Sequence, residues 1–250
     1  RRNPLIMRSR LIQTILLALV SGALFWKLES DYTMQGLSKG FNSKNGAFFF
    51  LGISAFMSSL SPMILTFPLE KNVFLKEQSS KMYSVGGYYL SRNMVEIPYL
   101  LIIPFITAIV VYWMMDLKST AENFFVFYLF LFLCTLAGTS FGLLSSSFFS
   151  DPKTAAGMVP LLVLPFMLFS GFYKNRKDLP EWIGWIEYIS PIKYTFVGLA
   201  NNEFNGTNAP ISLLNFDIGM WESVGVLIGM SILTRVISFF VLWVLKSKLQ

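Results

Sequence analysis

Long apolar runs, separated by short polar stretches, constrain the fold of this chain more than any other feature of its sequence. Hydrophobic residues make up 54% of the chain and charged residues only 14%, whereas roughly a quarter of a soluble domain is charged. Several windows reach the roughly 18 apolar residues that a helix needs to cross a bilayer. The sequence therefore predicts an all-α, polytopic membrane protein.

We predict six transmembrane helices. They cover about 11–28, 46–67, 90–115, 123–149, 154–173 and 224–245. An even number of spans places both termini on one side of the membrane, and the basic residues at both ends place that side in the cytoplasm. Lys39 and Lys44 lie in a predicted outside loop and are therefore exceptions to the rule that basic residues mark the cytoplasmic side. The net charge of +6 follows from the same bias and needs no nucleic acid as a partner.

The first ten residues carry four arginines around Leu5, Ile6 and Met7. This pattern predicts a short basic amphipathic helix that lies on the cytoplasmic face of the membrane and leads into the first span. A plain basic flank of that span explains the same residues equally well.

A charged island, residues 68–92, separates the second and third predicted spans. It contains Glu70, Lys71, Lys76, Glu77 and Lys81. In so apolar a chain these side chains are expected to reach water, so the island is predicted to be a cytoplasmic loop held by a span at each end. Such a loop is either a passive connector or a handle by which something outside the membrane moves the spans.

The long segment 174–222 precedes the last predicted span. Aromatic residues at 182, 185, 188, 194 and 196 surround a break at Ser190-Pro191, and aromatic side chains favour the membrane interface. We therefore predict a re-entrant helical hairpin in the outer interface. The triplet Asn205-Gly206-Thr207 fits an N-glycosylation acceptor, which supports an extracellular segment with Asn205 as the modified residue.

Several kinds of chemistry are excluded by composition. The chain has no histidine and a single cysteine, Cys134, inside an apolar run. A zinc site, a Cys/His catalytic pair and an intrachain disulfide are therefore excluded. Residues 36–46 contain glycines but lack the lysine–hydroxyl pair of a phosphate-binding loop. We predict no catalytic residue, no metal and no cofactor in this segment, which is not an enzyme by itself.

Two charges lie deep in predicted spans. Glu96 falls in the third span and Arg235 near the centre of the last one. A charge at such a depth costs roughly 2.5–3.5 kcal/mol on insertion scales, which makes a functional role the default hypothesis. Two structural explanations are favoured over it, because the sequence shows no chain of proton-relay groups. They are a Glu96–Arg235 pair, or two side chains that each extend to the cytoplasmic interface.

Five groups of residues, spread over the chain, carry a family resemblance. They are the Phe/Leu-rich second span, the charged loop Glu70…Val73-Phe74…Glu77…Tyr88-Tyr89, the start of the third span at Glu96-Ile97-Pro98, the end of the fifth at Leu168-Phe169-Ser170-Gly171-Phe172, and the stretch Trp182…Trp185…Tyr188-Ile189-Ser190-Pro191…Lys193-Tyr194 followed by Asn202-Glu203-Phe204. Together they resemble the membrane domain of White-type (G-subfamily) ABC transporters, over essentially all 250 residues.

The resemblance implies an exporter with two membrane domains, paired as a homodimer or a heterodimer. Each would follow an ATP-binding domain, expected before Arg1, that binds ATP and Mg. Residues 1–10 resemble the connecting helix. Within the coupling loop 68–89, residues 70–80 resemble the cytoplasmic coupling helix that docks on the ATPase. The coupling residues implied by position are Glu70, Phe74, Glu77 and, in the short second cytoplasmic loop, Asp151.

The resemblance also implies a substrate cavity on the dimer axis, between the second and fifth spans. The implied lining residues are Phe49, Phe50, Ile53, Ser54, Met57, Leu164, Met167 and Leu168, with Phe172 and Tyr173 as the outlet valve. Lipid contact or ordinary packing explains each phenylalanine equally well. Family members often carry cysteines in the outer loop, but 201–221 has none, so a covalent dimer through this loop is excluded.

The sequence thus leads to a functional hypothesis and a rival. The chain is expected to be the transmembrane half of an ATP-driven exporter that moves a hydrophobic small molecule by alternating access in a plasma membrane or endomembrane. An apolar slot favours a sterol, lipid or xenobiotic without selecting among them. The rival is a structural membrane subunit that keeps the transporter fold but has no ATPase motor.

Overall fold

The computed structural model describes residues 4–28, 37–79, 84–149, 151–173, 180–207, 214 and 216–247. Within these ranges every regular element is helical, which confirms the all-α part of the predicted fold class. The elements are α1 (Pro4–Leu24), α2 (Leu37–Ser79), α3 (Val85–Met114), α4 (Ala121–Phe148), α5 (Pro152–Gly157), α6 (Val159–Leu168), α7 (Glu181–Gly184), the 3-10 helix η2 (Trp185–Ile189), α8 (Pro191–Phe204) and α9 (Met220–Ser247).

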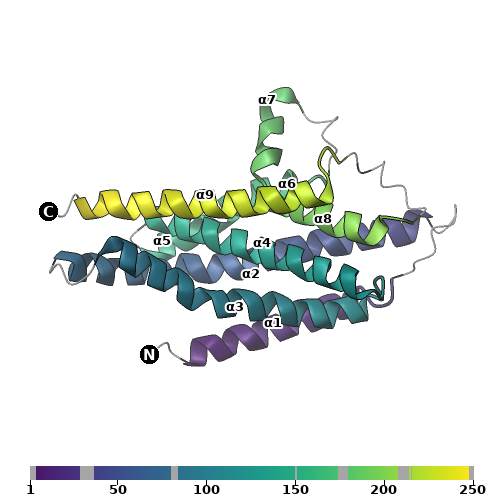
Figure 1. Cartoon of the computed structure of the whole chain (residues 1–250), viewed down its shortest axis with the longest axis horizontal. Helices are drawn as coiled ribbons and strands as arrows, with labels where there is room; N and C mark the ends of the chain where they lie inside the picture. Colours follow the sequence, from purple (N-terminus) through teal and green to yellow (C-terminus); the bar gives the residue numbers. More distant parts are fainter. Residues whose placement is uncertain are drawn as a thin grey trace.

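The long helices run side by side, and the two ends of the chain lie toward the same end of the bundle as the C-terminal end of α2 (Figure 1). Among the residues that the structure describes, four helical stretches are long and apolar enough to cross a membrane: Gly40–Lys71, Val85–Met114, Ala121–Phe148 and Met220–Leu245. Shorter apolar helices, Leu11–Leu24 and Pro152–Leu168, occupy the first and fifth predicted spans. The chain is therefore an integral membrane protein, and the count of six spans stays a prediction.

Helix α2 is longer than its predicted span at both ends. The prediction had a polar loop up to residue 45, a span over 46–67 and a second loop from residue 68, whereas one helix runs from Leu37 to Ser79. The start of the predicted coupling loop, 68–79, is therefore the last part of α2, and residues 80–83 lie outside the described ranges. Likewise, residues 4–10 of the predicted connecting helix are the first turns of α1.

Buried partners explain why polar residues continue α2. The Lys71 ammonium donates hydrogen bonds to the carbonyl oxygens of Ser147 (3.0 Å) and Phe149 (2.6 Å), at the C-terminal end of α4. A cation at that position satisfies the free carbonyl groups of a helix end and interacts favourably with its dipole. At the other end of α2, Lys44 is fully buried and pairs with Glu203 of α8 at 2.5 Å. Both lysines were expected to reach water.

Helix α4 lies at the centre of the bundle and packs against α2, α3, α8 and α9. Its backbone comes very close to α2 at two glycines, Gly138 and Gly142. A Cβ atom on Gly138 would lie 2.7 Å from the Phe56 carbonyl oxygen, and one on Gly142 would lie 3.1 Å from the Leu60 carbonyl oxygen. Two glycines four residues apart form the small-residue surface on which membrane helices approach closely.

The aromatic stretch before α9 forms two limbs that meet at Ser190. The first limb, α7 with η2, projects from the bundle (Figure 1) and exposes Trp182 and Trp185. The second limb, α8, is buried among α2, α4 and α9. Ser190 holds the corner: its hydroxyl donates to the Phe166 carbonyl oxygen (2.7 Å) and accepts the Lys193 N–H (3.4 Å). Placement of the first limb in the membrane interface stays a prediction, and residues 174–179 and 208–213 lie outside the described ranges.

Candidate functional site: a cavity between four helices

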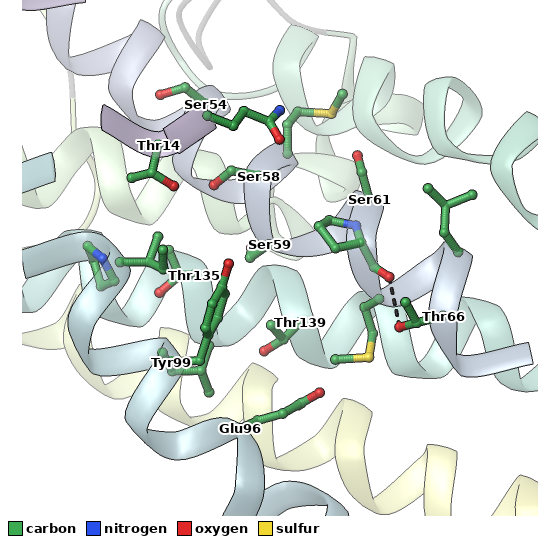
Figure 2. Close-up of a pocket in the computed structure, with 18 of the residues that line it drawn as sticks. Thr14, Ser54, Ser58, Ser59, Ser61, Thr66, Glu96, Tyr99, Thr135 and Thr139 are labelled. Carbon is green, nitrogen blue, oxygen red and sulfur yellow. Dashed lines mark hydrogen bonds between the residues drawn. The ribbon is translucent and has the colours of Figure 1, made fainter. Parts of the chain in front are cut away.

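A cavity of about 780 Å³ lies between α1, α2, α3 and α4. Its apolar lining comes from α1, α2 and α3, whereas polar side chains line it from all four helices, with Thr14 on α1 and Thr135 and Thr139 on α4 (Figure 2). The apolar side chains include Leu17, Phe50, Ile53, Met57, Leu100 and Ile103. The polar ones include Ser54, Ser58, Thr66, Tyr99, Thr135 and Thr139.

Several hydroxyl groups on the cavity wall donate their protons to carbonyl oxygens of their own helices. Ser54 donates to the Leu51 carbonyl oxygen at 3.0 Å, and Ser58 to that of Ala55 at 3.0 Å. On α4, Thr135 and Thr139 donate at 2.8 Å to the carbonyls of Phe132 and Leu136. A hydroxyl has one proton and two acceptor lone pairs. These groups therefore act toward the cavity as hydrogen-bond acceptors.

Three charged side chains line one end of the cavity. Arg92 of α3 contacts Glu70 of α2 through Nη1, and its Nη2 lies 3.3 Å from Oε1 of Glu96, one turn along α3. The side chains of Arg92 and Glu96 are each only 8% exposed, whereas that of Glu70 is 39% exposed. The cluster thus extends from the buried part of the bundle to its surface.

The two predicted intramembrane charges do not form an ion pair with each other. The Arg235 guanidinium donates to Oδ1 of Asn93 (2.8 Å) and to Oγ of Ser140 (2.8 Å), while Glu96 pairs with Arg92. The hydrogen bonds of Arg235 and the ion pair of Glu96 thus involve other residues than the predicted Glu96–Arg235 pair. Arg92 and Glu96 are four residues apart, a spacing at which oppositely charged side chains meet on a helix, so the sequence contained a signal for the observed pair.

The residues predicted to line a substrate cavity lie on two faces of α2. Phe50, Ile53, Ser54 and Met57 line the cavity described above, together with Tyr99, Thr135 and Thr139, which the sequence analysis did not single out. Phe49 lies instead against the predicted outlet valve. Its ring stacks on that of Phe172, with centroids 4.5 Å apart, and meets the edge of Tyr173 at 5.2 Å.

The predicted lining residues of α6 do not face the cavity. Leu164 and Leu168 are about half exposed on the surface of the bundle, and Met167 is partly buried against the core. A cavity shared by α2 and α6 is therefore not enclosed within a single copy of this chain. The predicted dimer-axis cavity needs a second membrane domain and stays a prediction.

The predicted coupling residues lie at the end of α2 and at the α4–α5 connection. A shallow hollow of about 370 Å³ is lined by Glu70, Val73, Phe74, Glu77 and neighbouring side chains. Phe74 is fully buried and stacks on Tyr88 at 4.3 Å, whereas Leu69 and Val73 are more than half exposed. The exposed apolar surface of this segment is thus made by Leu69 and Val73.

Asp151 caps the N-terminus of α5. Its carboxylate accepts hydrogen bonds from the backbone N–H and the hydroxyl of Thr154, both at 3.0 Å. These hydrogen bonds hold the pKa of Asp151 below its ordinary value. The residue is exposed and ionised at neutral pH, as a contact in a cytoplasmic loop requires.

Comparisons with known proteins identify relatives over most of the chain. A profile described as ABC-2 type transporter matches residues 1–204. ABC transporter G family member 2 of Dictyostelium discoideum is 34% identical over 199 residues, or 80% of this chain and 14% of the relative. Protein white of Drosophila melanogaster is 30% identical over 203 residues, or 81% and 29%.

A third relative is the broad substrate specificity ATP-binding cassette transporter ABCG2 of Rattus norvegicus. It is 31% identical over 205 residues, or 82% of this chain and 30% of the relative. The chain therefore spans less than a third of the length of each of these three relatives.

Proposed function

The chain is a membrane domain of the ABC-2 type transporter family, with White and G-family relatives, and we propose that it forms the transmembrane half of an ATP-driven exporter. Membership in this family implies transport across a membrane. The observation that carries the proposal is the family match over residues 1–204 of a membrane-spanning helix bundle. The ATP and Mg needed for transport would be bound by a nucleotide-binding domain that precedes residue 1 or belongs to another subunit.

The proposed transporter contains two such membrane domains and alternates between inward-open and outward-open states. The exported substrate is a hydrophobic small molecule, such as a sterol, lipid or xenobiotic, held between the α2 and α6 faces of the two copies. The exposed apolar side chains of Leu164 and Leu168 support this placement, because they offer a surface that a second domain can cover.

Reconstitution of the full-length protein into liposomes tests this function. ATP-dependent accumulation of a fluorescent sterol or a fluorescent xenobiotic in the lumen is the expected result for an exporter with its nucleotide sites facing outward. A structural subunit would show no ATP-dependent accumulation of either compound and no ATPase activity in the purified complex. The two hypotheses are thus separated by two measurements on one preparation, substrate accumulation and ATP hydrolysis.

The end of α2 is the proposed contact with the ATP-binding domain. Val73→Asp and Glu77→Gln are expected to abolish the stimulation of ATP hydrolysis by substrate. Val73 is exposed and Glu77 is partly buried in the same hollow, so both changes alter the surface through which motion would pass. Neither change removes a buried side chain, so each should change the free energy of unfolding by no more than about 0.5 kcal/mol. The thermal unfolding midpoint of each variant should therefore stay close to that of the wild type. Substrate-stimulated ATPase activity retained in both variants would refute the coupling role.

One further variant makes this experiment specific, and another is ruled out by the structure. Glu222→Gln neutralises an exposed carboxylate in the first turn of α9, at the opposite end of the bundle (Figure 1), and should leave the stimulation intact. Phe74→Ala is unsuitable as a test of coupling, although the sequence suggested it. It removes a fully buried ring that packs with Phe67, Leu143 and Leu242, and therefore destabilises the fold.

The proposed topology has six spans with both termini in the cytoplasm and the segment around Asn205 outside. Asn205 is exposed at the end of α8, as a glycosylation acceptor must be. When the full-length protein is expressed in a eukaryotic cell, Asn205→Gln is expected to remove the mobility shift that a glycosidase removes from the wild type. An unglycosylated wild-type protein that has reached its membrane would contradict the assignment.

A further inference from the structure

We propose that Lys71 is a positioning residue that holds the end of α2 and the start of α5 together as one unit. The end of α2 is the proposed contact with the ATP-binding domain, and the connection before α5 carries Asp151, which the family resemblance implies as a second contact. A movement received by either segment would then be imposed on the other. This consequence for transport rests on the proposed function, whereas the positioning role itself does not.

The Lys71 side chain bridges α2 and the C-terminal end of α4. Its ammonium donates to the carbonyl oxygen of Ser147, the last residue but one of α4, at 3.0 Å, and to that of Phe149, the first residue beyond α4, at 2.6 Å. An ammonium has three protons and no planar arrangement of donors, so one group can bond two carbonyls that point in different directions. The Lys71 residue is only 2% exposed, so water competes little for these protons.

These two hydrogen bonds fix the angle at which the chain leaves α4. Phe149 has an extended backbone, with φ −105° and ψ 144°, and its N–H bonds the Ser146 carbonyl oxygen at 3.3 Å. The helix therefore ends between the two carbonyls that Lys71 bonds, and the last carbonyls of a helix have no partner within it. Because the ammonium holds one carbonyl on each side of this change of direction, a residue of α2 sets the path from α4 to α5.

Helix α5 also rests on α2 through contacts of its own. Asp151, two residues after Phe149, caps α5 by accepting the N–H and hydroxyl of Thr154, and its carbonyl oxygen accepts the Ala155 N–H at 3.1 Å. Ala155 is 1% exposed and belongs to the main core. Helix α5 packs more extensively on α2 than on α4 or α6, its neighbours along the chain. The path out of α4 thus leads to a helix whose main support is α2.

Apolar packing already holds α2 against α4 in this region. Phe67 and Phe74 of α2 belong to one buried cluster with Leu143 of α4 and Leu242 of α9. The ammonium of Lys71 adds direction, because a hydrogen bond depends on its angle whereas apolar burial does not. Loss of the ammonium should therefore loosen α5 more than it loosens the rest of the bundle.

Hydrogen exchange of the full-length protein in phosphatidylcholine nanodiscs tests this role without substrate or ATP. The N–H groups of Thr154 and Ala155 report on the start of α5, since both bond Asp151. Lys71→Met nearly keeps the length of the side chain but removes its donors. In this variant we expect peptides that cover the two residues to exchange at least about ten-fold faster than in the wild type. Peptides from the buried helix α8 should exchange as in the wild type.

Further variants separate positioning from stability. Leu143→Ala removes a buried side chain one turn before Ser147 on α4 and leaves Lys71 in place. It should lower the thermal unfolding midpoint without selectively faster exchange at α5. Lys71→Arg keeps a cation with several N–H donors and should restore most of the protection. Lys71→Gln, a shorter side chain without charge, provides the same comparison if the methionine variant does not fold.

Two results would overturn the positioning role. One is an equal rise of exchange at α5 in Lys71→Met and Leu143→Ala, since lost stability alone would then explain it. The other is an arginine variant no better protected than the methionine variant, because the donor cation would then be irrelevant.

ATP hydrolysis tests the consequence for transport. The measured quantity is the rate stimulated by the fluorescent sterol or xenobiotic of the transport assay, divided by the basal rate. We expect this ratio to fall at least about three-fold in Lys71→Met, to recover in Lys71→Arg and to keep its wild-type value in folded Leu143→Ala. A merely structural role for Lys71 would give the methionine and alanine variants the same ratio.

The two proposals fail in distinguishable ways. An unchanged ratio in a Lys71→Met protein whose α5 exchanges faster would refute transmission of movement through this unit and leave the exporter standing. If the wild type itself hydrolyses no ATP, the exporter proposal fails, and the exchange experiment still decides whether Lys71 positions α5.

Discussion

Replacing Lys44 with methionine is expected to destabilise the folded protein by about 3 to 5 kcal/mol. Lys44 is fully buried in α2, and Oε1 of Glu203 in α8 accepts its hydrogen bond at 2.5 Å. Removal of the ammonium leaves a carboxylate in the low-dielectric interior, where the Lys118 N–H donates to its other oxygen at 3.2 Å. For a chain of this size the loss corresponds to a fall in the thermal unfolding midpoint of about 6 to 20 °C.

Two further variants distinguish a buried-charge effect from simple loss of packing. In Lys44→Met/Glu203→Met both charges are removed, and most of the lost stability should return, since uncharged side chains of similar volume can replace a buried ion pair. Lys118→Met removes a lysine whose ammonium bonds the Asn205 carbonyl oxygen near the surface and should change stability by no more than about 0.5 kcal/mol. A double variant as unstable as the single one would contradict this explanation.

Replacing Gly138 with leucine is expected to destabilise the fold by about 3 kcal/mol or more, because the side chain cannot fit between α2 and α4. Even the first added carbon would lie 2.1 Å from Oγ of Ser59 and 2.7 Å from the Phe56 carbonyl oxygen. The serine can rotate, but the backbone oxygen can move only if the two helices separate. The yield of monodisperse full-length protein in detergent, measured by size-exclusion chromatography, should therefore fall sharply.

Gly229 provides the matched control for this prediction. It lies within α9, and a Cβ atom there would meet nothing within 4 Å. Gly229→Ala should be neutral or stabilising by up to about 1 kcal/mol, because alanine is the better helix former. If Gly138→Leu were tolerated as well as Gly229→Ala, close approach of the backbones would not be what holds α4 against α2.

The transmembrane helices could be predicted wherever an apolar run has bilayer length. The fourth predicted span, 123–149, corresponds to Ala121–Phe148, and the third, 90–115, lies within the range that α3 covers except for its last residue. The physical reason is local. A backbone surrounded by lipid has to satisfy its hydrogen bonds within its own segment, so a long apolar run is restricted to a helix.

The ends of α2 could not be predicted in this way. Lys71 was assigned to water as part of the charged island, and Lys44 to a predicted outside loop. Their partners lie 76 and 159 residues away, at the Ser147 carbonyl and at Glu203. The same limit applies to the cavity. The serines of α2 were noted in the sequence, but the residues opposite them on α3 and α4 come together only when the bundle packs.

The sequence by itself determined that this chain is a helical membrane domain, and its motifs determined the family. Both conclusions rest on local patterns: the length of apolar runs and the spacing of side chains along them. The tertiary structure alone decided which charges are buried, where α2 ends and which hydroxyls share a cavity. Those features depend on contacts between helices far apart in the chain, and the free energy of a buried charge is set by the partner that meets it there.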